Sequence, residues 1–86
     1  MQISKQLMDV FYERDRAALK EKKYELSFAW SNCESMVNNL HHGRPLVEWL
    51  TQFRNIVVDW RDEAADDELR AAYDEALEFV DIAMPS

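Results

Sequence analysis

The sequence predicts an all-α fold, an antiparallel bundle of three or four helices in a single domain over residues 1–86. The 86 residues include one Gly and two Pro, whereas an all-β chain needs a turn about every 8–12 residues. Apolar residues make up 48% of the chain, which favours a packed core over disorder. They recur at intervals of three and four residues, the spacing of amphipathic helices. The length allows one small domain.

The first predicted helix runs from about Ser4 to His41 and is either bent or divided near Lys22. Ser4 can cap its N-terminus, and Ile3 can pack on Met8 as a hydrophobic staple. No Gly or Pro interrupts this stretch. Large apolar residues become sparse in its middle, so one continuous helix and two shorter helices both fit the pattern.

Whether this helix is continuous bears on the oligomeric state. A continuous helix would be about 57 Å long, and the two shorter helices that follow could not cover it. Its apolar face at Leu7, Val10 and Phe11 would then need a second subunit. A helix divided near Lys22 would instead give four helices of similar length in a compact bundle.

The strongest helix breaker is the run His-His-Gly-Arg-Pro in the middle of the chain. Gly43 suits the left-handed position just after a helix, and Pro45 suits the first turn of the next one. We therefore predict a second helix from Pro45 to about Arg61. This helix also carries Val47 and Val58 outside its main apolar stripe, which favours a central position in the bundle over an exposed contact patch.

A further break is predicted between Arg61 and Asp66. The apolar residues on its two sides form faces rotated by about 150°, so one straight helix could not bury both against one core. Asp62, Asp66 and Asp67 are all suitable N-caps. The last predicted helix therefore extends from about Asp66 to Ala83.

Charge is distributed unevenly along the chain, whose net charge is −7. Residues 1–55 carry eight bases and seven acids, whereas residues 56–86 carry two bases and ten acids. This asymmetry disfavours contact of the last third with nucleic acid or anionic lipid, and it favours a basic protein partner. The simpler interpretation is that the charge maintains solubility.

Carboxylates of the last predicted helix fall along one line that faces away from its apolar stripe. They are Asp67, Asp74, Glu78 and Asp81, with Glu75 and Glu68 beside them. A solvated outer face is one interpretation. The alternative is a row that binds a basic surface and competes with phosphate for its cations, an association that would weaken with salt.

Tyr24 and Phe28 lie four residues apart and project opposite the apolar stripe of their own segment. Exposed aromatic side chains on a polar helix face commonly anchor protein interfaces. We therefore treat these two as candidate partner-binding residues. The alternative is that a neighbouring helix covers them.

Nothing in the sequence indicates catalysis, a cofactor or a metal site. It contains no Gly-rich phosphate loop and no nucleophile elbow, and Cys33 falls on an apolar stripe. His41 and His42 are adjacent, whereas metal-binding pairs on helices are three or four residues apart. We expect neither an enzyme nor direct binding of nucleic acid, because no basic recognition helix is visible.

We predict a cytoplasmic chain that does not span a membrane, because it has a lone cysteine, no long apolar stretch and no signal peptide at the start.

We expect a small acidic protein-interaction module, monomeric or homodimeric, that inhibits or regulates a basic protein such as a nuclease. Immunity proteins, antitoxins and phage anti-defence inhibitors such as anti-CRISPR factors share this size and charge, which is an association only. The alternative is a homo-oligomeric structural or assembly protein built on a long first helix.

Overall fold

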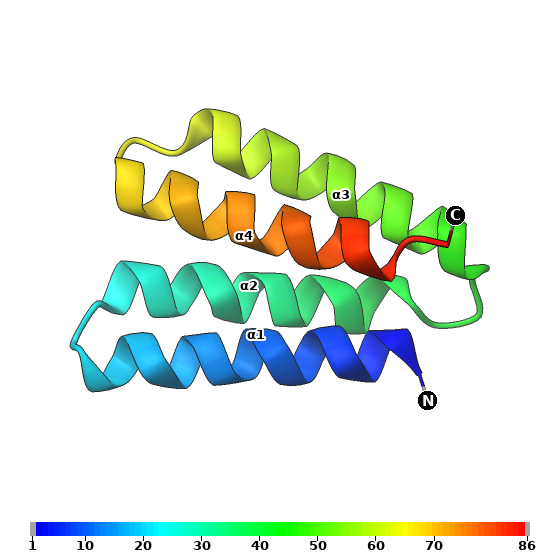
Figure 1. Ribbon diagram of the computed structural model, residues 1–86, viewed down its shortest axis with the longest axis horizontal. Helices are drawn as coiled ribbons and strands as arrows, with labels where there is room; N and C mark the ends of the chain where they lie inside the picture. The colour runs from blue at the N-terminus through cyan, green and yellow to red at the C-terminus, as the bar shows by residue number, and fades with distance from the viewer. Residues whose placement is uncertain (1, 86) are drawn as a thin grey trace.

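The computed structural model describes residues 2–85 and confirms the all-α prediction (Figure 1). Within this range the chain forms four helices: α1 (Ile3–Lys20), α2 (Tyr24–Leu40), α3 (Leu46–Glu63) and α4 (Asp67–Ala83). Successive helices run antiparallel and pack as a bundle of 36 × 25 × 21 Å. None of the helices in the described range combines the length and the hydropathy that crossing a bilayer requires.

The first predicted helix is divided, at Lys22. This residue adopts φ 59°, in the left-handed region. The Lys23 N–H donates to the Ala18 carbonyl at 2.9 Å, and the Lys22 N–H donates to the Leu19 carbonyl at 3.0 Å. These two bonds form a Schellman motif, which ends α1 and turns the chain back into α2. The long helix that would have required a second subunit is therefore absent.

The predicted start near Ser4 is correct to within one residue, but the predicted Ser4 N-cap is wrong. α1 begins at Ile3, Gln2 takes the N-cap position without a side-chain cap hydrogen bond, and Ser4 is buried inside the first turn. Ile3 and Met8 both pack against the core as half-buried side chains of the helix. Burying Ile3 on the core outweighs the preference of about 1 kcal/mol for a capping residue at the helix start.

The other two predicted breaks are confirmed. Gly43 has φ +66° in the α2–α3 connection, and Pro45 directly precedes α3. The break before α4 falls at residues 64–66, with α3 continuing to Glu63. There the Asp66 carboxylate accepts a hydrogen bond of 2.8 Å from the Leu69 N–H, as an N-cap residue does.

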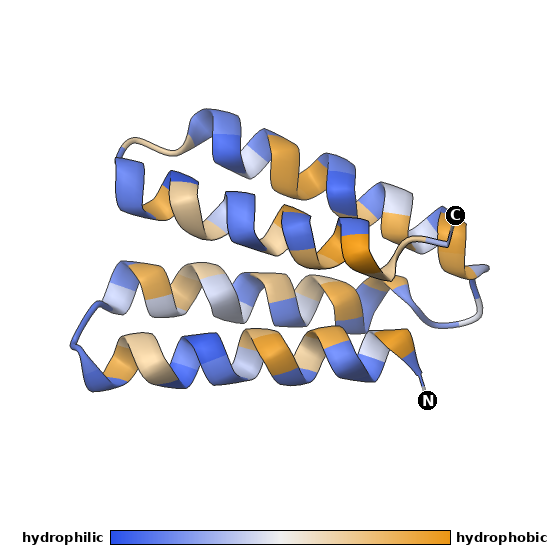
Figure 2. Cartoon of the chain, viewed as in Figure 1, coloured by the Kyte–Doolittle hydropathy of each residue, from blue (hydrophilic) through white to orange (hydrophobic). Residues whose placement is uncertain are grey.

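The core is centred on Phe11, which is fully buried. Its ring centroid lies 5.8 Å from that of Trp30 in α2, 5.8 Å from that of Phe53 in α3 and 6.3 Å from that of Phe79 in α4. Each helix thus contributes one aromatic ring to a single cluster, which joins the two helical hairpins. Hydrophobic and hydrophilic residues alternate around every helix, as Figure 2 shows.

The central helices are α2 and α4, and the expected central position of α3 is wrong. Each of α2 and α4 packs against all three other helices, whereas the α1 and α3 backbones do not approach one another. Val47 of α3 is 52% exposed. The buried faces of α2 and α4 include the small residues Cys33, Ala72 and Ala76.

Candidate protein-binding surface

A shallow groove runs between α2 and α4 at the end of the bundle that holds the α1–α2 and α3–α4 connections. It consists of three adjoining hollows that share lining residues. We call it the α2–α4 groove and define it by Tyr24, Phe28, Ala29 and Asn32 of α2, Leu69 and Tyr73 of α4, and Trp60 of α3. Figure 1 shows α3 diverging from α2 toward this end, and Trp60 and Glu63 of α3 line one of the three hollows.

The two predicted aromatic anchors are the most exposed part of this groove. Tyr24 is 64% exposed and Phe28 is 68% exposed. They lie one turn apart on α2 and line the same hollow as Leu69 and Tyr73. The alternative in which a neighbouring helix covers them is therefore wrong within residues 2–85.

The deeper side of the groove is made by half-buried residues of α3 and α4. The Trp60 and Tyr73 rings lie 6.0 Å apart and bridge these two helices. Burial, with a smaller contribution from Cys33, raises the pKa of the Tyr73 phenol, so its hydroxyl stays protonated at neutral pH. Asn32 supplies an amide beside these rings, which gives the groove a polar group within an apolar wall.

The rim of the groove is acidic. Glu25, Glu63, Asp66 and Glu68 line its three hollows, and Lys23 is the one base that lines them. Lys23 Nζ lies 3.0 Å from Glu68 Oε1, and the hydrogen bond and charge of Glu68 raise the pKa of Lys23. The Asp66 carboxylate is also held by its capping bond to α4. The rim therefore has an excess of negative charge around apolar walls.

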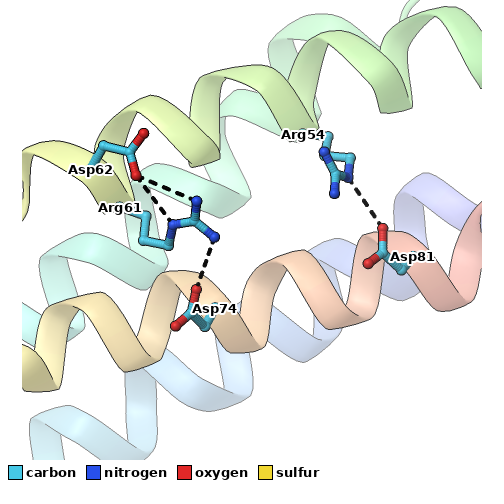
Figure 3. A network of polar contacts seen from close by, with 5 residues as sticks. All are labelled: Arg54, Arg61, Asp62, Asp74 and Asp81. Atoms are coloured by element: carbon cyan, nitrogen blue, oxygen red, sulfur yellow. Dashed lines mark hydrogen bonds and ion pairs between the residues drawn. The ribbon is translucent and has the colours of Figure 1, made fainter.

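The predicted carboxylate row on α4 lies elsewhere, and α3 supplies bases to two of its members (Figure 3). Asp74 Oδ1 accepts a hydrogen bond from Arg61 at 3.3 Å, and Asp81 Oδ1 accepts one from Arg54 at 3.2 Å. Arg61 also contacts the neighbouring Asp62. The hydrogen bond that Arg61 donates to Asp74 is the largest cause that raises the pKa of Arg61.

The remaining members of the row point in different directions. Glu75 Oε1 lies 2.5 Å from Arg14 Nε on α1, and the Arg14 guanidinium also stacks over Phe79. Asp67 pairs with Arg70 of its own helix at 2.9 Å. Glu78 has no ion pair with any residue in the range 2–85. The ion pairs thus link α4 to α3 on one side and to α1 on the other.

The structure separates the two sets of predicted site residues. Tyr24 and Phe28 line the α2–α4 groove, whereas none of Asp67, Asp74, Glu75, Glu78 and Asp81 does so. The sequence interpretation missed the groove walls from α3 and α4, and it placed the rim residue Glu68 beside the carboxylate row. Leu69 and Tyr73, four residues apart, carry the same spacing as Tyr24 and Phe28. This shared spacing is the one sequence signal that could have indicated that these faces of α2 and α4 line a common groove.

Other reactive side chains do not assemble a second site in the described part of the chain. Burial raises the pKa of the Cys33 thiol to about 12, which keeps it protonated and unreactive. The His41 and His42 rings lie 4.0 Å apart beside Trp49. No cluster of three or more His, Cys, Asp or Glu side chains in residues 2–85 is arranged to hold a metal ion.

Comparisons of the chain with protein-family models, with curated proteins and with solved structures found no match.

Proposed function

We propose that this chain is a protein-binding module that occupies a basic surface of another protein and blocks or regulates it. The carboxylates of α4 would take the positions that phosphate groups take on that surface. A nuclease or another nucleic-acid enzyme has the cationic groove that this mode of binding needs. Immunity proteins, antitoxins and anti-CRISPR factors would differ in the target and share this mode.

The observation that carries this proposal is the negative surface of α4. Residues 56–86 have a net charge of −8, and Asp67 and Asp81 mark the ends of a carboxylate line about 21 Å long. Side chains of Asp74 and Asp81 are 54% and 61% exposed although each has an arginine partner. Exposed ion pairs contribute about 0–1 kcal/mol, so a target cation can replace an internal one.

Glu78 is the focus of this surface because no internal base neutralises it within residues 2–85. Four carboxylates near it pair with three guanidiniums: Asp62, Asp67, Asp74 and Asp81 pair with Arg54, Arg61 and Arg70. The excess is negative and solvent-exposed. Such a field speeds association with a cationic surface and is screened by salt.

The test is retention of a partner on the immobilised protein from a native extract at about 0.05 M and about 0.5 M salt. We expect a basic protein that is retained at the lower salt and released at the higher one. Glu78→Lys should abolish retention, whereas Glu13→Lys, an exposed substitution on α1, should not. Retention that is unchanged by the higher salt and by Glu78→Lys would contradict the proposal. Asp74 is a poorer target for reversal because a lysine there would face Arg61.

The assembly hypothesis is less well supported. It depended on an uncovered apolar face at the start of a long first helix. Leu7 and Phe11 are instead buried by the other helices of the same chain. Sedimentation over a range of protein concentrations tests this point, and a dimer that persists at all concentrations would favour the assembly hypothesis.

A further inference from the structure

We infer that the α2–α4 groove binds an amphipathic helix of a partner protein, with apolar residues on its inner face and Lys or Arg on its flanks. This inference rests on the proposed function, because it assumes a basic protein partner and names the part of it that docks. It adds a second contact, distinct from the carboxylate row of α4. The row supplies long-range attraction, and the groove supplies the desolvated apolar contact.

The shape of the groove fits a helix. Tyr24, Phe28 and Asn32 mark three successive turns of α2, a length of about 12 Å. Leu69 and Tyr73 provide two turns of α4 opposite them. An amphipathic helix presents apolar anchors at this same interval of three or four residues. Two anchors one turn apart can therefore lie between the aromatic side chains of α2 and the α4 wall.

The chemistry of the walls indicates a macromolecular contact. Tyr24 and Phe28 expose about two thirds of their surface and form one apolar patch with Leu69 and Tyr73, and an exposed apolar patch with a polar rim is typical of an interaction site. Aromatic side chains are also the residues that contribute most to protein interfaces. The Asn32 side chain makes no hydrogen bond within residues 2–85, so its amide can bond to a polar group of the bound helix.

The rim decides the charge of the occupant. Four carboxylates line the groove, and Glu68 already holds the one lysine there. Glu25 on α2 and Glu63 on α3 lie on different helices that border the groove, so a helix with cations on both flanks can pair with both. A second copy of this chain is a poor occupant, because each copy has a net charge of −7 and like charges repel.

The probe for this inference is a synthetic helical peptide of about 14 residues, with Leu on one face and Lys on both flanks. A peptide of equal composition with scrambled Leu positions and one with Glu in place of Lys serve as controls. Binding is measured by amide chemical shifts of the whole labelled chain and by the intrinsic fluorescence of its three tryptophans, of which Trp60 lines the groove. We expect saturable shifts at Tyr24, Phe28, Asn32, Leu69 and Tyr73 with the Leu/Lys peptide, and weaker binding of both control peptides.

Variants on the groove distinguish specific docking from general attraction. Phe28→Ala should weaken binding of the Leu/Lys peptide by at least about tenfold. Tyr12→Ala removes an aromatic that is 50% exposed on α1 and should leave binding unchanged. Glu78→Lys should change peptide affinity by less than about threefold, because Glu78 does not line the groove. Both alanine variants replace exposed side chains, so their fold is preserved.

Several outcomes would overturn the inference. These are shifts that do not saturate by about 1 mM peptide, shifts centred outside the groove, or equal binding of the scrambled peptide. Self-association that Phe28→Ala abolishes would make a second copy the occupant. The two proposals can fail separately. An extract partner lost with Glu78→Lys but kept with Phe28→Ala would support the carboxylate row and reject the groove.

Discussion

The outer side of α4 and the α2–α4 groove differ in how far other side chains of the same chain pair with or cover their residues. On the outer side, Arg54 and Arg61 of α3 already pair with Asp81 and Asp74. In the groove, Tyr24 and Phe28 lie about two thirds exposed. The first surface is partly neutralised within the fold, whereas the second is apolar surface left in water. An unsatisfied surface is the stronger indication of an external partner.

Truncating aromatic residues that differ in burial should give the largest contrast in stability. Phe11→Ala removes the ring that joins all four helices, and we expect it to lower the free energy of unfolding by about 3–5 kcal/mol. Phe28→Ala removes an exposed ring, and we expect a change below about 0.5 kcal/mol. Urea denaturation followed by circular dichroism measures both. A large loss of stability with Phe28→Ala would mean that this residue belongs to the core rather than to a binding surface.

The rim residue Asp66 combines a structural and an electrostatic role, and two substitutions separate them. Asp66→Ala removes the cap bond to the Leu69 N–H and should reduce the free energy of unfolding by about 1 kcal/mol. Asp66→Asn keeps an N-cap while removing the charge, so stability should be nearly unchanged. Thermal denaturation at neutral pH compares the three proteins. Equal loss in both variants would show that the charge at the start of α4, rather than the cap, stabilises the helix.

A glycine at position 22, in the connection between α1 and α2, should stabilise the fold. Lys22 has φ 59°, a conformation that is unfavourable for a residue with a Cβ and readily adopted by glycine. We expect Lys22→Gly to raise the free energy of unfolding by about 0.5–1 kcal/mol. Lys22→Ala, which also removes the charge but keeps the Cβ, should not. Chemical denaturation of the two variants gives the comparison, and destabilisation by Lys22→Gly would contradict the assigned turn.

Local chemistry explains which parts of the fold could be predicted from the sequence. Gly43 adopts the positive φ that a residue without a Cβ readily takes, and Asp66 takes the N-cap position that its carboxylate favours, so the breaks near them were predictable. The break at Lys22 was left open because a Schellman turn usually contains glycine and this one contains lysine. Its formation depends on packing of Phe11 against the rings of the other helices, a tertiary effect that helical periodicity does not contain.

The candidate site was less predictable than the fold. The helical pattern of α2 predicted that Tyr24 and Phe28 project opposite its apolar stripe, but it left open whether a neighbouring helix covers them. The groove depends on how far α3 diverges from α2, which no local pattern encodes. Pairing of Asp74 and Asp81 with arginines depends on the register between α3 and α4. Sequence periodicity places these carboxylates on one line, and only the packed bundle shows that the line is already partly neutralised.

The strength of that neutralisation can be measured on the Arg54–Asp81 pair. Both side chains are largely exposed, so a double-mutant cycle with Arg54→Ala and Asp81→Ala should give a coupling energy of about 0.2–1 kcal/mol. This coupling should fall toward zero at about 0.5 M salt. A larger or salt-insensitive coupling would mean that the pair is a fixed element of the fold and is not available to a target cation.

Glu34 provides the smallest expected effect and a contrast to the paired row. It lies on α2, and partial burial with the charges of Asp15 and Asp9 raises the pKa of its carboxyl group. A carboxyl whose pKa is higher in the folded than in the unfolded state favours folding only while it is protonated. Its contribution is therefore present below the unfolded pKa and is lost as pH rises through the folded pKa.

Glu34→Gln should accordingly raise the Tm slightly at pH 7, where the native Glu34 is ionised beside two other acids. The gain should shrink as the pH is lowered through the range in which carboxyl groups titrate, and be absent once Glu34 is protonated in both states. Glu13→Gln, at an exposed position of α1, serves as the control and should change the Tm by less. A gain of equal size at pH 7 and at acid pH would assign the effect to helix propensity rather than to unpaired charge. In that case the unpaired charge of Glu34 would cost the fold no more stability than the unpaired charge of Glu78 does on the outer side of α4.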